Sequence, residues 1–169
     1  MLIDTISSHY VKDILEIGTA VGYSSLRIAS ACPWVVIDTL EKDEARYQKA
    51  LENKALLKCD QVNMILSDAK TWVADKFYDV IIIDGAKAQN QFFFDKYLPL
   101  LKPHGMMFVD NMHFHGHVEA MPQGKARRNL RQMVSKIAKF NEYVHSLDHL
   151  ECELLDIDDG LLKIRRKIG

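Results

Sequence analysis

The sequence has few cysteines and no long uncharged segment. Its three cysteines, Cys32, Cys59 and Cys152, are odd in number and lack the spacing of metal ligands, so we expect buried, reduced thiols. The longest segments without an acidic or basic residue cover only residues 17–26 and 28–37. A membrane-spanning helix needs roughly 18 to 20 such residues, so no membrane span is expected.

We expect no secretory signal, and the sequence contains no repeat, low-complexity tract or linker. Asp4 interrupts any apolar core near the N-terminus, and no small-residue cleavage site follows a basic start. With 169 residues, 48% of them hydrophobic and 27% charged, the composition is that of an ordinary globular protein of one domain. We therefore expect a single cytoplasmic domain over residues 1–169, with no membrane partner.

A net charge of -1 hides a strong asymmetry near the C-terminus. Residues 124–139 contain six cations and no acid, whereas residues 147–160 contain six acids and no lysine or arginine. The cations include Arg127, Arg128 and Arg131, which offer a phosphate-contacting face on a helix. A solvated helix face is the alternative interpretation, so charge alone does not decide whether the chain binds nucleic acid.

Short apolar runs alternate with segments of helical character along most of the chain. The β-branched run at residues 80–83 is typical of a strand covered on both faces, as in parallel sheets. Apolar residues at three- and four-residue steps predict a long helix over residues 126–146, and residues 158–160 predict a hairpin turn. Together these patterns predict an α/β fold with a mostly parallel sheet and helices on both faces. The strands are expected over residues 11–18, 35–40, 62–66, 78–84, 106–110, 150–155 and 161–166, and the other helices over residues 22–30, 43–57 and 89–101.

The turn after the first predicted strand carries two glycines, Gly18 and Gly22, where the backbone could pass close to a ligand. Their spacing is Gly-x-x-x-Gly and not the Gly-x-Gly-x-x-Gly of dinucleotide sites, which disfavours NAD. Glu16, inside the same motif, would repel a phosphate and suits a ligand with positive charge.

Two further acids follow the next predicted strands. Glu41 ends the second strand, from which a carboxylate can accept both hydroxyls of a ribose. Asp68 follows the third strand with Ser67 and Ala69, where a short polar side chain could read an adenine edge. Each feature also has a structural interpretation on its own. In this order on this scaffold they favour a cationic nucleoside, and S-adenosylmethionine, with its sulfonium and ammonium groups, fits.

Oxygen-bearing side chains end the fourth and fifth predicted strands. Asp84 ends the fourth, and Asp110 and Asn111 end the fifth. If these strands are neighbours, about 4.8 Å apart, the three side chains converge at one edge of the sheet. Oxygen ligands without histidine or cysteine favour Mg²⁺, with Mn²⁺ or Ca²⁺ as the next choices. Lys87 follows closely enough to act as a base or a charge partner.

Several motifs resemble those of the bacterial cation-dependent O-methyltransferases related to catechol and caffeoyl-CoA methyltransferases. The basic Arg127-Arg128 helix and two short segments resemble the branch that methylates 5-hydroxyuridine in tRNA, making 5-methoxyuridine at the wobble position. The family motifs are Ile14-Leu15-Glu16-Ile17-Gly18, Gly22-Tyr23-Ser24, Ile83-Asp84-x-x-Lys87, Leu98-Pro99-Leu100-Leu101-Lys102-Pro103-x-Gly105 and Val109-Asp110-Asn111, and the branch segments are Ala86-Lys87-x-Gln89 and Phe140-Asn141-Glu142.

The resemblance implies a Rossmann-like class I methyltransferase fold, with a seven-stranded, mostly parallel sheet that ends in an antiparallel hairpin. It implies that Asp84, Asp110 and Asn111 hold the metal, that Lys87 is the general base beside Asp84, and that tRNA is the partner. The residues that it assigns to the S-adenosylmethionine pocket are Glu16, Gly18, Gly22, Ser24, Ser25, Glu41, Asp68, Ala69 and Asp84.

The sequence departs from the family pattern before the first strand. Family members carry a helical segment there that caps the cofactor and contributes to a dimer interface, whereas few residues precede Val11, so we expect a shortened or missing cap and leave a homodimer open. The family pattern also rarely includes the three alternating histidines His113, His115 and His117. Two interpretations stay open: they are metal ligands, or they belong to a polar loop that faces the substrate. Two alternatives stay open: methylation of small catechol-like or phenolic acceptors, and a shortened non-catalytic homologue that binds RNA or cofactor.

Overall fold

The computed structural model describes residues 1–85, 87–113 and 128–168. Seven strands form one sheet in the order β3-β2-β1-β4-β5-β7-β6. The first five strands run parallel, and β7 pairs antiparallel with both β5 and β6. The predicted sheet, mostly parallel with an antiparallel C-terminal hairpin, is therefore confirmed. The strands are β1 (Asp13–Ile17), β2 (Val36–Glu41), β3 (Val62–Leu66), β4 (Tyr78–Ile83), β5 (Leu101–Val109), β6 (Leu150–Leu155) and β7 (Leu161–Arg166).

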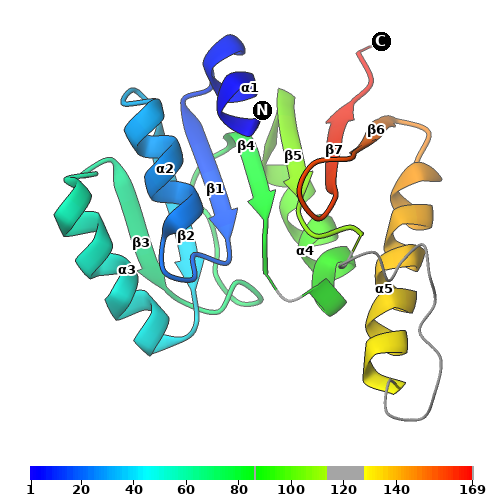
Figure 1. Cartoon of the computed structure of the whole chain (residues 1–169). Coiled ribbons are helices and arrows are strands. Elements are labelled where there is room, and N and C mark those ends of the chain that lie inside the picture. The colour runs from blue at the N-terminus through cyan, green and yellow to red at the C-terminus, as the bar shows by residue number, and fades with distance from the viewer. Residues whose placement is uncertain (86, 114–127, 169) are drawn as a thin grey trace.

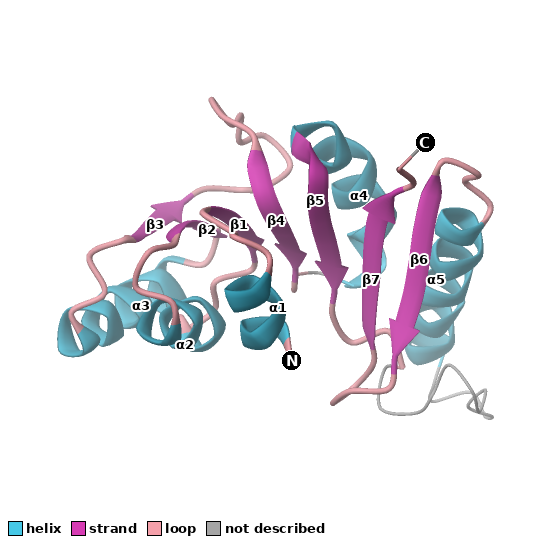
Figure 2. Ribbon diagram, turned by 90° about the horizontal axis from the view of Figure 1, so that it is seen from above, coloured by secondary structure: helices cyan, strands magenta, loops and turns pink. Residues whose placement is uncertain are grey.

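Helices cover both faces of this sheet (Figures 1 and 2). Helices α1, α2 and α3 lie against one face, and α4 and α5 lie against the other, as Figure 2 shows from above. None of the helices in the described part of the chain is long and apolar enough to cross a membrane. The helices are α1 (Leu2–Ser8), α2 (Tyr23–Ala31), α3 (Glu44–Leu57), α4 (Asn90–Tyr97) and α5 (Arg128–His145), with short 3₁₀ turns η1 (Lys87–Gln89) and η2 (Leu98–Leu100).

Successive strand residues face two separate core layers, because side chains alternate across a strand. Ile14 of β1 packs with Leu26 of α2 in one layer. The next residue, Leu15, packs in the other layer with Phe94 of α4 and Phe140 of α5. This alternation explains why the central strands read as continuous apolar runs.

Two predicted elements are wrong in extent, and one helix was not predicted. The helix expected over residues 89–101 ends at Tyr97, because Pro99 cannot continue the main-chain hydrogen bonding and the chain tightens into η2. Strand β5 begins at Leu101, which already pairs with Tyr78, rather than at residue 106. Helix α1 was not expected. The other bounds agree within about two residues, except that the predicted start of the last helix, at residues 126–127, lies outside the described residues.

Candidate active site

The order in which the chain adds strands to the sheet reverses at β1, which lies between β2 and β4. In open α/β sheets, ligands bind at the carboxyl ends of the strands beside such a point. A cavity of about 290 Å³ lies there, lined by residues that follow the first four strands. Five of the residues predicted to bind the cofactor line it, namely Gly18, Glu41, Asp68, Ala69 and Asp84.

Gly18 allows the turn after β1 to pass against the end of β4. Its φ is +103°, and a Cβ atom at this position would collide with the main-chain oxygen of Asp84. The main-chain N–H groups of Gly18 and Thr19 both donate to the carbonyl of Leu40, at 3.0 Å. The turn is therefore held between β2 and β4, and it forms one wall of the cavity.

Glu41 forms a second wall and also stabilises the turn. One carboxylate oxygen, Oε2, accepts the N–H of Ala20 at 2.8 Å, and the other, Oε1, accepts the N–H of Asp43 at 2.9 Å. A carboxylate has about four acceptor sites, so each oxygen keeps capacity for a further donor such as a hydroxyl. Glu41 can thus shape the cavity and bind a ligand in the same conformation.

The turn after β3 is held in place by side chains of α4. The carbonyl of Ala69 accepts the hydroxyl of Tyr97 at 2.6 Å and the ammonium of Lys96 at 2.8 Å, both from α4. Asp68 is exposed, and its Oδ1 accepts the N–H of Lys70 at 2.9 Å. The side chain of Asp68 therefore lies at the cavity on a turn that α4 holds in place.

Four predicted cofactor residues lie outside the residues that line the cavity. Glu16 is only 1% exposed, and its Oε2 accepts the hydroxyl of Thr39 at 2.6 Å. Its other oxygen, Oε1, has no hydrogen-bond partner in the described structure. Burial raises the pKa of Glu16 to about 7. Gly22 and Ser25 are buried and Ser24 is partly buried around the start of α2.

The structure brings together the three residues predicted to hold a metal. The side-chain amide of Asn111 donates to Asp84 Oδ1 at 3.2 Å, and the N–H of Asn111 donates to Asp110 Oδ1 at 2.7 Å. Asn111 has a φ of +59°, a conformation that asparagine tolerates better than most residues and that turns its amide back toward β4. Two carboxylates and an amide thus meet where β4 and β5 end.

Electrostatics at this edge favour a positively charged ligand. Desolvation and the nearby charge of Asp110 raise the pKa of Asp84 to about 6. Desolvation also raises the pKa of Asp110, and the charges of Asp158 and Asp159 add to it. Lys87, in η1, acts in the opposite direction on both Asp84 and Asp110. Carboxyls whose pKa is raised by burial and by neighbouring negative charges are stabilised as anions when a cation binds beside them.

Known proteins identify the family. Residues 1–167 match the O-methyltransferase family. This chain belongs to the O-methyltransferase family. The caffeoyl-CoA O-methyltransferase of Populus kitakamiensis is 27% identical over 165 residues, which cover 92% of this chain and 70% of that protein. The tapetum-specific methyltransferase 1 of Arabidopsis thaliana is 28% identical and covers 93% of this chain, with 70% of its own length matched.

Solved structures agree with this assignment. A Staphylococcus aureus protein, provisionally assigned as a caffeoyl-CoA O-methyltransferase, has a TM-score of 0.91 and 39% identity, over 98% of this chain and 81% of its own. The SAH-bound methyltransferase PaMTH1 of Podospora anserina has a TM-score of 0.89 over 99% of this chain and 76% of its own. Its identity of 24% is low, so that likeness shows the fold alone. The class I methyltransferase fold is therefore confirmed.

The residues of this O-methyltransferase fit both ligands expected from the sequence. A buried carboxylate oxygen without a partner, at Glu16, suits a cofactor with a cationic group. The oxygen donors of Asp84, Asp110 and Asn111 suit a hard divalent cation. No cluster of three or more His, Cys, Asp or Glu side chains that could hold a metal occurs among residues 1–85, 87–113 and 128–168. The predicted set contains only two carboxylates, with an amide as third donor, and the Mg²⁺ site stays a prediction.

Two of the three cations predicted to contact RNA, Arg128 and Arg131, lie on α5 of the O-methyltransferase. Arg128 and Arg131 are exposed, and α5 packs against η1, which carries Lys87. Arg127 lies outside the described residues, as do His115 and His117. His113 is described, and its Nε2 lies 3.4 Å from Asp156 Oδ1.

Sequence reasoning missed three groups of residues in and around this site. Gln89 and Phe93, from η1 and α4, line the cavity, as do the cationic Lys42 and Arg46 beyond β2. Thr39, which binds Glu16, was also missed. Its position directly opposite Glu16 depends on the register of β1 against β2, and the sequence gives no signal for that register.

Proposed function

We propose that this chain is an O-methyltransferase that uses S-adenosylmethionine and a divalent cation, with Mg²⁺ as the first choice and Mn²⁺ or Ca²⁺ as the next. One observation carries the proposal: Asp84 lines the cavity at the switch point and also contacts Asn111 of the pair that ends β5. A single carboxylate thus adjoins both the space for a methyl donor and the set of oxygen donors for a cation.

The chain's own residues would divide the chemistry as follows. Glu41 would bind the ribose hydroxyls, and Asp84 with Asp110 and Asn111 would hold the cation. A cation held by these residues would supply Lewis-acid chemistry, which lowers the pKa of a hydroxyl group. Lys87, in its neutral form, would accept the hydroxyl proton as a general base. Transfer of a methyl group from a sulfonium then depends mainly on alignment, which fixed sites on two adjoining strand ends provide.

For the acceptor, we propose 5-hydroxyuridine at the wobble position of tRNA. Two features support it: the likeness of the Lys87 and Arg127-Arg128 segments to the tRNA-modifying branch, and the exposed Arg128 and Arg131 on a helix that packs against η1. Cations on α5 would bind phosphates next to a site that is otherwise acidic.

Small catechol-like or phenolic acceptors are the second candidate. The specific observation in their favour is that relatives at 25–28% identity are named caffeoyl-CoA O-methyltransferases. A non-catalytic homologue that only binds RNA or cofactor would be a third possibility, against which the joint presence of Asp84, Lys87, Asp110 and Asn111 argues.

Labelled methyl transfer separates these candidates. The protein is incubated with labelled S-adenosylmethionine and Mg²⁺, and in parallel with tRNA containing 5-hydroxyuridine, the same tRNA without it, catechol, or caffeoyl-CoA. We expect label only in the hydroxylated tRNA, as 5-methoxyuridine on nucleoside mass spectrometry, and its loss with EDTA. Lys87→Met should lower turnover about a hundredfold without weakening cofactor binding. Label in catechol or caffeoyl-CoA alone would overturn the tRNA assignment, and no transfer to any acceptor would overturn the enzymatic one.

A further inference from the structure

The loop that follows β5 is bound to the turn between β6 and β7 by two main-chain hydrogen bonds. The N–H of Met112 donates to the carbonyl of Gly160 at 3.0 Å. The N–H of His113 donates to the carbonyl of Asp159 at 2.8 Å. Asn111, which the proposed function makes a ligand of the cation, directly precedes these two bonds. The C-terminal hairpin is therefore part of what fixes this side chain.

Asn111 adopts a backbone conformation that needs such support. Its φ of +59° lies in a sparsely populated region, and residues stay there only where the surrounding structure holds them. The side chain of the next residue, Met112, is 2% exposed and packs in the core, so it anchors the loop to the sheet. On the other side, the N–H of Asp110 donates to the carbonyl of Ile83 in β4 at 3.1 Å. Because the loop is fixed on both sides, the amide of Asn111 is held where it reaches Asp84.

Gly160 is the residue that lets the hairpin and the loop approach each other. It is buried, and its φ of +83° is a conformation that residues with a side chain rarely adopt. A Cβ atom there would collide with the ring of His113 and would lie 2.8 Å from the main-chain nitrogen of the same residue. The ring could turn away, but the nitrogen could move only if the bonds between the loop and the turn lengthened or broke. A side chain at position 160 would therefore push the loop away from the hairpin.

The same turn lies close enough to the candidate cation site to act on its charge. Desolvation raises the pKa of Asp110, and the negative charges of Asp158 and Asp159 raise it further. Asp158, Asp159 and Gly160 are consecutive, so the main-chain contact and this electrostatic effect come from one turn. The position of the turn thus matters to the site in two separable ways.

We propose that Gly160 is a positioning residue for the cation site: because it carries no side chain, the turn between β6 and β7 can bind the main chain of residues 112 and 113 and so hold Asp110 and Asn111 toward Asp84. This inference rests on the proposed function, since it concerns the residues that would hold the divalent cation. It assigns Gly160 no contact with the cation and no part in the reaction itself.

The test measures the dissociation constant of Mn²⁺ alone, from the electron paramagnetic resonance signal of the free ion. Gly160→Ala adds the colliding Cβ atom. A glycine inserted between Asp158 and Asp159 moves the turn out of register with the loop without such a collision. Asp158 is exposed, so the inserted residue can be accommodated, and this variant supplies the test if Gly160→Ala does not fold. Asp158→Asn removes one charge of the turn and keeps its main chain.

Gly105→Ala is the matched control. Gly105 is also a buried glycine, within β5, where a Cβ atom would lie 2.7 Å from Leu101 Cδ1 and 2.9 Å from the main-chain oxygen of Asp79. This change should lower the free energy of unfolding without displacing the loop after β5. Urea unfolding measures the stability of each variant, and calorimetric titration with S-adenosylmethionine shows whether its cofactor cavity is intact.

We expect Gly160→Ala and the insertion to weaken Mn²⁺ binding about tenfold to a hundredfold, the range for groups that orient metal ligands. Amide hydrogen exchange at Met112 and His113 should become faster in the same two variants. Gly105→Ala should keep the Mn²⁺ dissociation constant within about twofold, and Asp158→Asn within about threefold, because neither breaks the bonds to the loop. S-adenosylmethionine binding should stay within about threefold in every variant, since Gly160 is not among the residues that line the cavity.

Three results would overturn the inference alone. Unchanged Mn²⁺ binding in both turn variants would show that the hairpin does not position the ligands. Equal weakening in Gly160→Ala and Gly105→Ala would show a general loss of stability, and equal weakening in Gly160→Ala and Asp158→Asn would show a purely electrostatic effect. A wild-type chain that does not bind Mn²⁺ would instead overturn the proposed cation site, so the two failures are distinguishable.

Discussion

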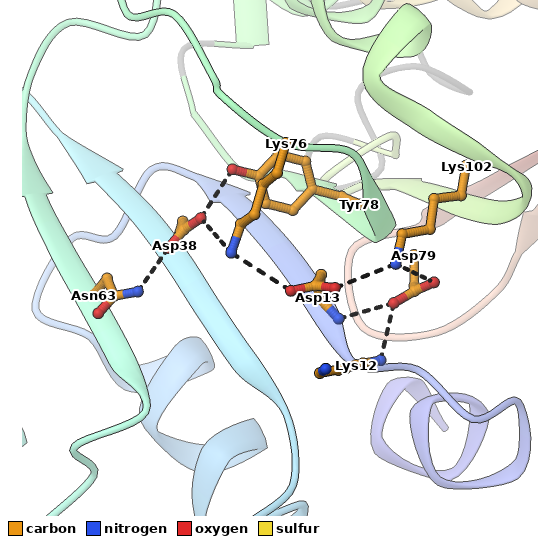
Figure 3. Close-up of polar contacts among 8 residues, drawn as sticks. All are labelled: Lys12, Asp13, Asp38, Asn63, Lys76, Tyr78, Asp79 and Lys102. Carbon is orange, nitrogen blue, oxygen red and sulfur yellow. Dashed lines mark hydrogen bonds and ion pairs between the residues drawn. The ribbon is translucent and has the colours of Figure 1, made fainter.

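Acidic side chains lie near both ends of the strands, that is, at the amino-terminal and at the carboxyl-terminal edge of the sheet. The charges that surround them differ between these two edges. At the amino-terminal side, the acids of β1, β2 and β4 are paired with lysines, as Figure 3 shows. Lys76 lies 3.0 Å from Asp38 and 3.5 Å from Asp13, and Lys102 lies 3.0 Å from Asp79 and 3.2 Å from Asp13. Each ammonium thus bridges acids from two neighbouring strands.

The pKa values follow this difference. Burial alone would raise the pKa of Asp79, but the N–H groups of Asp13 and Lys12 and the charge of Lys102 lower it on balance. At the carboxyl-terminal edge the pKa values of Glu16 and Asp84 are raised to about 7 and about 6. Acids whose charge is compensated within the chain stabilise the fold, whereas acids crowded beside a cavity gain their compensation from a ligand.

The largest effect should come from Asp110→Asn at the crowded edge. This change removes one anionic oxygen from the proposed cation site, and we expect methyl transfer with Mg²⁺ to fall on the order of a thousandfold. The free energy of unfolding should not fall, because the variant also relieves the repulsion that raises the pKa of Asp84. Steady-state rates and urea unfolding measure the two quantities. Near-normal transfer that resists EDTA would remove the cation from the mechanism.

The second effect concerns the stability of the cofactor-free protein against pH. The pKa of Glu16 rises from 4.5 to about 7 on folding, so between these values the folded state binds more protons than the unfolded state. The free energy of unfolding that Glu16 contributes therefore falls as pH rises through this range. Glu16→Gln has no carboxyl group at this position, so this pH-dependent loss of stability should be absent from the variant.

We expect Glu16→Gln to gain on the order of 3 kcal/mol over wild type between pH 4.5 and pH 8, measured by denaturant unfolding at each pH. Saturating S-adenosylmethionine should reduce this gain, because its ammonium group would compensate the Glu16 charge. A difference that stays constant with pH would show that Glu16 does not titrate in this range.

Asp79→Asn at the paired edge is the matched counterpart of Asp110→Asn. Asp79 Oδ2 accepts the N–H groups of Lys12 and Asp13, at 3.0 Å and 2.8 Å, and its Oδ1 pairs with Lys102. We expect the loss of this charge to lower the free energy of unfolding by about 1–2 kcal/mol. Methyl transfer below the unfolding temperature should stay within twofold. Equal losses of activity in the two variants would show that the edges do not differ in function.

Much of the fold could be predicted because its signals are local. Strands β3, β6 and β7 have the predicted bounds, since each apolar segment ends at a turn. Strand β5 was predicted too short, because Pro103 and Gly105 near its start are typical of loops. Helix α1 has only two turns, which is too short for an apolar periodicity to stand out.

The contacts of the site also fall into those that the sequence predicts and those that it does not. The sequence alone brings Asp84 and Asp110 together, because the carboxyl ends of parallel strands meet at one edge of the sheet. The bond from Thr39 to Glu16 depends on strand register, and the ion pair of Asp13 with Lys102 joins residues far apart in the chain. Contacts of this kind are set by tertiary packing, and no local pattern of residues signals them.

The smallest effect tests how an acidic edge could accept RNA. If the α5 cations bind phosphates, replacing Arg128 and Arg131 with alanine should raise the KM for tRNA several-fold at low salt. The slope of log affinity against log salt should fall by about one to two, because each arginine releases roughly one counterion from the RNA. The KM for S-adenosylmethionine should not change.

Replacing Lys49 and Lys54 of α3 instead, on the opposite face of the sheet, should leave the salt slope as in wild type, since cations there are remote from α5. An identical slope in wild type and the α5 variant would remove RNA contacts from this helix, and it would leave small phenolic acceptors as the better match to the acidic edge.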